Sequence, residues 1–80
     1  MRRARILVVD DEEGVRSSLT GILRDEGYLV ETADSGEKCL ELVAKNDYQA
    51  IFLDVWLPGR DGLEILGELM SRSTPPTVVM

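Results

Sequence analysis

The chain has 80 residues, enough for one small domain or for part of one. Hydrophobic residues make up 44% of it and charged residues 30%, a composition typical of folded globular chains and not of disordered ones. The net charge of −6 argues against direct binding to nucleic acid or to an anionic membrane surface, and it suits a divalent cation.

The numbers of histidines and cysteines limit the metal sites, catalytic groups and disulfides that the chain can form. The chain has no histidine, which removes the commonest zinc ligand and the usual general base. Its single cysteine, Cys39, has no internal partner for a disulfide, which is consistent with a reducing cytosol. The apolar run at residues 6–9 is far too short for a signal-peptide core or a membrane span. We therefore expect a cytoplasmic protein without a membrane segment.

Four short segments are predicted to be strands. They cover residues 6–9, 28–33, 50–53 and 77–80. The first and third are apolar at every position, which is typical of strands that are covered on both faces of a sheet. Pro58 and Gly59 indicate a turn, and residues 73–76 indicate a loop.

Three amphipathic helices are predicted between these strands. Their apolar stripes are Val15, Leu19, Ile22 and Leu23 in the first helix, Leu40, Val43 and Ala44 in the second, and Leu63, Leu66, Leu69 and Met70 in the third. Gly27 is predicted to end the first helix, and residues 46–47 the second. Asp34 and Asp61 are predicted to cap the second and third helices, because each has a glutamate three residues further on.

The alternation of strands and helices predicts the fold class. Buried strands separated by helices favour a parallel sheet with right-handed crossovers and helices on both faces. We therefore predict an α/β fold with a doubly wound parallel sheet in the strand order 2-1-3-4. In such a sheet ligands bind beyond the carboxyl ends of the strands, where the strand order reverses.

Three aspartates follow two strands that this order makes neighbours. Asp10 and Asp11 come after the first strand, and Asp54 ends the third, so their carboxylates should converge. A set of oxygen ligands without histidine or cysteine suits Mg²⁺, which would also relieve the repulsion between the carboxylates. A carboxylate that is anionic at neutral pH can attack phosphorus without a general base, so Asp54 is a candidate phosphoryl acceptor. The alternative interpretation is an acidic first turn favoured by the helix dipole, together with a polar strand end.

Two segments resemble a known family. The sequence from Ile6 to Glu12 (ILVVDDE) and that from Leu53 to Gly62 (LDVWLPGRDG) are similar to the receiver domain of bacterial response regulators, and the resemblance runs over the whole chain. It implies a flavodoxin-like fold in which Asp54 receives a phosphoryl group from a histidine kinase.

The resemblance also implies the ligands of the magnesium ion. Asp11 would bind Mg²⁺ directly, Asp10 would help through water, and Asp54 and the backbone carbonyl of Trp56 would complete the protein ligands. The indole ring of Trp56 is then expected to be a partly exposed loop aromatic, and Cys39 a small packing residue.

The chain departs from the family pattern at its end. The family carries a Ser or Thr at the end of strand four and a Lys at the end of strand five, and neither can be assigned, because Thr77 opens strand four. We therefore expect residues 1–80 to be a receiver domain that is incomplete at its C-terminus, before the last helices and the fifth strand. The stripe of the first helix and the edge of strand four would then be exposed, which predicts a possible homo-oligomer.

Other functions compete with the signalling switch. A Mg²⁺-dependent phosphatase could also use Asp54 as its nucleophile, but such enzymes resemble a pattern with a second aspartate at the place of Trp56. A flavin site would need a different first loop, because the acidic residues 10–13 repel phosphate. A receiver that acts only as an interaction module is a further alternative. The sequence WLPG at residues 56–59 resembles receivers attached to ATPase-containing transcription activators, so the expected output is transcription control through an effector beyond Met80.

Overall fold

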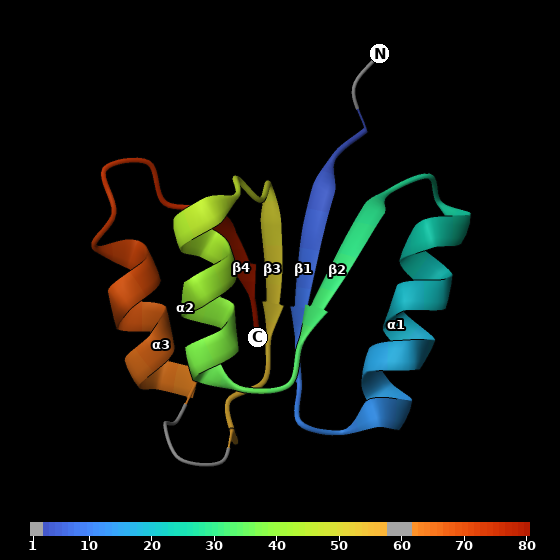
Figure 1. Ribbon diagram of the computed structural model, residues 1–80, viewed down its shortest axis with the longest axis horizontal. Coiled ribbons are helices and arrows are strands. Elements are labelled where there is room, and N and C mark those ends of the chain that lie inside the picture. Colours follow the sequence, from blue (N-terminus) through green and yellow to red (C-terminus); the bar gives the residue numbers. More distant parts are fainter. Residues whose placement is uncertain (1–2, 58–61) are drawn as a thin grey trace.

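The computed structural model describes residues 3–57 and 62–80 (Figure 1). Strands and helices alternate along the chain in the order β1 (Arg5–Val9), α1 (Glu13–Asp25), β2 (Leu29–Ala33), α2 (Gly36–Lys45), β3 (Ala50–Leu53), α3 (Gly62–Met70) and β4 (Thr77–Val79). The four strands form one parallel sheet in the order β2-β1-β3-β4. The predicted doubly wound α/β fold and its strand order are therefore confirmed. None of the helices in the described ranges is long and apolar enough to cross a membrane.

The core lies between the sheet and helices α2 and α3, which stand side by side in Figure 1. Leu7 and Val9 of β1 belong to this core, together with Cys39 of α2 and Ile65 of α3. Because alternate side chains of a strand point to opposite faces, Ile6 and Val8 face the other side, where α1 contacts β1 and β2. The prediction that Cys39 is a packing residue is confirmed, because its side chain is fully buried.

Helix α1 covers its face of the sheet loosely. None of its residues is buried, and Val15 and Ile22 are 37% and 61% exposed. The helix ends as predicted at Gly27, whose φ of 94° is the left-handed conformation that glycine adopts most easily. The amide of Gly27 donates to the carbonyl of Arg24, and that of Tyr28 to the carbonyl of Leu23, so the end is a Schellman motif.

Two predicted helix faces were wrong in part. In α2 the buried positions are Gly36, Cys39 and Val43, while Ala44 is exposed. In α3 they are Gly62, Ile65 and Leu69, while Leu63 and Met70 are 62% and 43% exposed. Helix α3 is apolar around most of its circumference, so the spacing of its apolar residues left more than one possible buried face.

The predicted cap of α2 was also wrong. Ser35, not Asp34, is the N-cap, because the Ser35 backbone is extended and its Oγ accepts a hydrogen bond of 3.2 Å from the Lys38 amide. Asp34 lies one residue too early for this bond. The predicted turn at residues 58–59 and the cap at Asp61 lie outside the described residues.

Candidate functional site

The three predicted aspartates meet at the carboxyl edge of the sheet. Asp10, Asp11 and Asp54 each present a carboxylate oxygen within 4.8 Å of the others. The register of the strands brings them together, because Val9 of β1 is opposite Leu53 of β3, and Asp10 and Asp54 are the next residues. The amide of Asp54 donates to the carbonyl of Val9 at 3.0 Å, which extends the ladder by one further bond. The site is thus formed by two adjacent strand ends.

Local hydrogen bonds hold two of these carboxylates. Oδ1 of Asp10 accepts a bond of 2.9 Å from the Glu12 amide, and Oδ1 of Asp54 accepts one of 3.1 Å from the Trp56 amide. Both aspartates are half-buried, whereas Asp11 is exposed. Within residues 3–57 and 62–80, the second carboxylate oxygen of Asp10 and of Asp54 accepts no hydrogen bond.

Trp56 lies beside the cluster but does not cover it. The residue as a whole is 82% exposed, as expected for a loop aromatic, and its backbone amide donates to Asp54 in the bond just described. Trp56 is the single tryptophan of residues 1–80. Its role as a carbonyl ligand stays a prediction, as do the ligand and acceptor roles of the three aspartates.

The backbone of Gly62 packs very closely against the backbone of Asp54 and Val55, at the end of β3. Its amide donates to the carbonyl of Val55 at 2.7 Å. A Cβ atom at this position would lie 2.6 Å from Cα of Val55 and would collide with the carbonyl oxygen of Asp54. The first residue of α3 must therefore lack a side chain for the helix to pack against the peptide that follows the candidate acceptor.

Arg16 also contacts the site, and sequence reasoning missed it. It lies in the first turn of α1, and its Nη1 donates a bond of 2.7 Å to the carbonyl oxygen of Asp10. A cation six residues after an aspartate gave no sequence signal, because arginines at helix starts are common on solvated surfaces.

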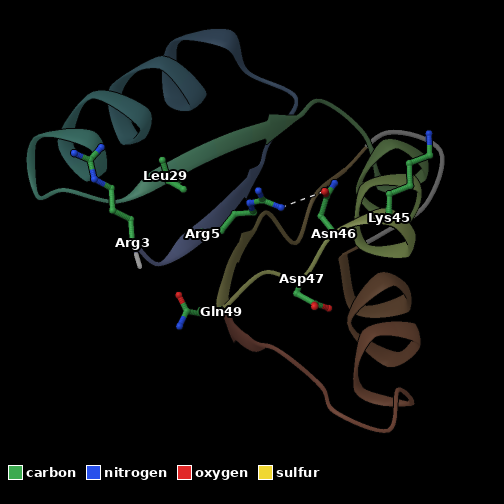
Figure 2. A pocket seen from close by; sticks show the side chains of 7 residues that line it. All are labelled: Arg3, Arg5, Leu29, Lys45, Asn46, Asp47 and Gln49. Atoms are coloured by element: carbon green, nitrogen blue, oxygen red, sulfur yellow. Dashed lines mark hydrogen bonds between the residues drawn. The ribbon is translucent and has the colours of Figure 1, made fainter. Parts of the chain in front are cut away.

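Two hollows lie at opposite ends of the strands. An apolar hollow of about 300 Å³ adjoins the carboxylates and is lined by Asp10, Asp54 and Trp56 among apolar side chains. A larger hollow of about 580 Å³ lies at the amino ends of the strands (Figure 2) and is lined by Arg3, Arg5, Leu29, Lys45, Asn46, Asp47 and Gln49. The larger hollow is remote from the three carboxylates, so its size does not make it part of the site.

Polar side chains near the amino ends of the strands form a hydrogen-bonded network. Arg5 donates to Asn46 at 3.1 Å, as drawn in Figure 2, and also approaches Glu31 at 3.6 Å. Tyr48 donates to Glu31 at 2.5 Å and accepts a bond of 3.4 Å from Asn46. Burial, followed by the bond to Glu31, raises the pKa of Tyr48 to about 12, and burial raises that of Cys39 to about 11. Neither Tyr48 nor Cys39 belongs to the cluster of Asp10, Asp11 and Asp54.

Comparison with known proteins decides the family. Residues 6–80 match the response regulator receiver domain. The chain belongs to this family. The response regulator MprA from Mycobacterium sp. (strain KMS) is 49% identical over 67 residues, which are 84% of this chain and 29% of that relative.

Solved structures agree with this assignment. The response regulator protein TrrA from Thermotoga maritima, in complex with Mg²⁺-BeF, superposes with a TM-score of 0.89 at 39% identity, over 94% of this chain and 65% of that one. TrrA in complex with the histidine kinase ThkA gives a TM-score of 0.87 at the same identity and coverage. The receiver chain thus has the flavodoxin-like fold, and it spans less than a third of the length of the curated relatives it matches.

Proposed function

We propose that Asp54 accepts a phosphoryl group from a phosphohistidine of a histidine kinase, and that this reaction switches the receiver between two states. The observation that carries the proposal is the cluster of three carboxylates within 4.8 Å at the carboxyl ends of β1 and β3. The family match adds the reaction class, and the complex of TrrA with the kinase ThkA supports the class of partner. We propose a regulatory phospho-acceptor and not an enzyme that turns over a free substrate.

The residues present fit a magnesium ion. Asp10, Asp11 and Asp54 provide oxygen donors, the kind that Mg²⁺ prefers, and the Trp56 carbonyl would add a fourth. Neither histidine nor cysteine lies in the cluster, which disfavours zinc. When bound, the ion would neutralise negative charge on the transferring group. The solved complex of TrrA with Mg²⁺-BeF supports this choice of metal.

The chain contributes a nucleophile that needs no base. A carboxylate oxygen of Asp54 would form the new bond to phosphorus as the bond from phosphorus to the kinase imidazole breaks. The electron pair of that bond returns to the imidazole nitrogen, which takes a proton from solvent. Asp54 becomes an aspartyl phosphate. The bond from the Trp56 amide to Oδ1 orients the carboxylate before attack.

Further parts of the proposal concern the whole protein. We propose that phosphorylation controls transcription through an effector in the remainder of a longer protein, and that residues 1–80 are part of a receiver that continues beyond Met80. The exposed stripe of α1 and the edge of β4 are compatible with a homo-oligomer. We propose that the phosphoryl transfer takes place in the cytoplasm, a reducing compartment that suits the free thiol of Cys39.

Mass spectrometry tests the proposal. The full-length protein is incubated with Mg²⁺ and acetyl phosphate, a small phosphodonor, and then compared with Asp54→Asn. The proposal predicts a gain of one HPO₃ group that requires Mg²⁺ and is lost in the variant. The absence of a gain in the natural protein would contradict the acceptor role. Rapid multiple turnover of a phosphoester would favour the phosphatase alternative instead.

A further inference from the structure

Arg16 fixes the peptide group that joins two of the candidate metal ligands. Its guanidinium is half-buried, and Nη1 donates a short bond of 2.7 Å to the carbonyl oxygen of Asp10. That carbonyl belongs to the peptide unit between Asp10 and Asp11. Because a peptide unit is planar, fixing its carbonyl also fixes the direction in which the chain enters Asp11. One side chain thus constrains the backbone of both residues.

Two backbone amides also hold the loop at residues 10–12, because the amide of Asp10 donates to the carbonyl of Ala33 at 3.1 Å and that of Glu12 donates to Oδ1 of Asp10 at 2.9 Å. Glu12, the N-cap of α1, makes no capping bond with its side chain, and Gly14 in the first turn is a weak helix former. The side chain of Asp11 is exposed, so its position depends on the backbone that carries it. Among the described residues, Arg16 is the only one outside the loop whose side chain donates to the loop backbone.

We propose that Arg16 is a positioning residue for magnesium binding, an inference that rests on the proposed function. It acts through the loop by holding Asp10 and Asp11 in the arrangement that Mg²⁺ requires. Mg²⁺ demands near-ideal octahedral geometry, so a small displacement of two ligands matters more for this ion than for calcium. Groups that orient metal ligands commonly change metal affinity by about 10–100-fold when they are removed.

The positive charge of Arg16 would have the opposite effect on Mg²⁺ affinity. A guanidinium near a cation site repels the cation, so removing its charge alone would tighten Mg²⁺ binding. Loss of ligand positioning would weaken it. The direction of the change therefore separates a positioning role from a simple charge effect.

The test measures Mg²⁺ affinity by isothermal titration calorimetry of the full-length protein. Three variants are compared with the natural protein. Arg16→Met keeps an unbranched apolar stem but removes the donor and the charge, and Arg16→Lys keeps one donor and the charge. Lys45→Met removes one charge at the amino ends of the strands, remote from the carboxylates, and is the matched control. Thermal unfolding in EDTA, followed by circular dichroism, reports whether each variant folds.

The inference predicts Mg²⁺ binding weakened about tenfold or more in Arg16→Met. It predicts an intermediate affinity in Arg16→Lys and natural affinity in Lys45→Met. Unchanged or tighter binding by Arg16→Met would overturn it, as would an equal loss in Lys45→Met. If Arg16→Met does not fold, Arg16→Lys decides, because natural affinity in that variant would overturn the inference. Failure of the natural protein to bind Mg²⁺ would instead contradict the proposed function.

Discussion

Gly62→Ala should damage the stability of the fold and the site together. The added Cβ would lie 2.6 Å from Cα of Val55, whereas ordinary contacts of this kind begin at 3.4 Å, and it would also meet the carbonyl oxygen of Asp54. Both neighbours are backbone atoms, so neither can rotate away. Helix α3 and the end of β3 must separate by close to an ångström. Overpacking of this kind costs typically 1–3 kcal/mol, and the rigid neighbours favour a value of about 3 kcal/mol.

Gly67→Ala in the same helix is the matched control. An added Cβ there has no atom within 4 Å, and alanine is favoured over glycine inside a helix by about 0.5–1 kcal/mol. Urea unfolding of the full-length protein, followed by far-UV circular dichroism, should therefore show opposite signs for the two variants. Isothermal titration calorimetry of the same two variants measures Mg²⁺ binding, which we expect Gly62→Ala to weaken.

Two outcomes would refute this reasoning. One is a Gly62→Ala variant as stable as the natural protein, which would mean that the close approach of α3 to the strand end is not present in solution. The other is an equal loss in both variants, which would point to a general intolerance of α3 to alanine.

Three further predictions concern groups outside the site. Because the pKa of Tyr48 is raised from 10.0 to about 12, the folded state holds its proton more tightly, so the stabilisation is complete below pH 10 and is lost as the pH rises toward 12. Tyr48→Phe should remove this part of the pH dependence of urea unfolding and cost about 1 kcal/mol at neutral pH through the lost bond to Glu31. Cys39 is fully buried and its pKa is raised to about 11, so a thiol reagent at pH 8 should label it only as the protein unfolds. Ser35→Ala should cost about 1 kcal/mol in the same urea assay, because α2 loses its N-cap bond.

Each of these has a clear contrary result. An unchanged alkaline profile in Tyr48→Phe would mean that the Tyr48 hydroxyl is not the titrating group. Rapid labelling of Cys39 in urea-free buffer would contradict the burial of α2 against the sheet. Natural stability of Ser35→Ala, with a loss in Asp34→Ala, would restore the cap that the sequence alone favoured.

Much of the sheet and the convergence of the carboxylates could be predicted from the sequence. Residues 6–9 of β1 and all four residues of β3 are apolar, so both segments are predicted to be strands covered on both faces. Once the strand order makes β1 and β3 neighbours, residues that follow both strands must meet at one edge. The clustering of Asp10 and Asp54 thus needed only topology and not the positions of side chains.

Helix faces and supporting contacts were harder to predict. Leu69 was assigned correctly to the buried face of α3, whereas Leu63 and Met70 are exposed and Ile65, which was not assigned, is buried. The choice depends on how the helix rotates against the sheet. The close approach of Gly62 and the bond from Arg16 both end on backbone atoms of other segments. Backbone partners leave no residue-specific signal in a single sequence, so such contacts emerge only from the folded arrangement.

The central claim is that Asp54 is the residue that becomes phosphorylated. Its most direct test is to treat the full-length protein with Mg²⁺ and acetyl phosphate, reduce it with borohydride, and map the product by peptide mass spectrometry. Borohydride converts an aspartyl phosphate to homoserine and leaves free aspartate unchanged. We predict homoserine at position 54 alone and only when Mg²⁺ is present. Homoserine at Asp10 or Asp11, or at no position, would contradict the account.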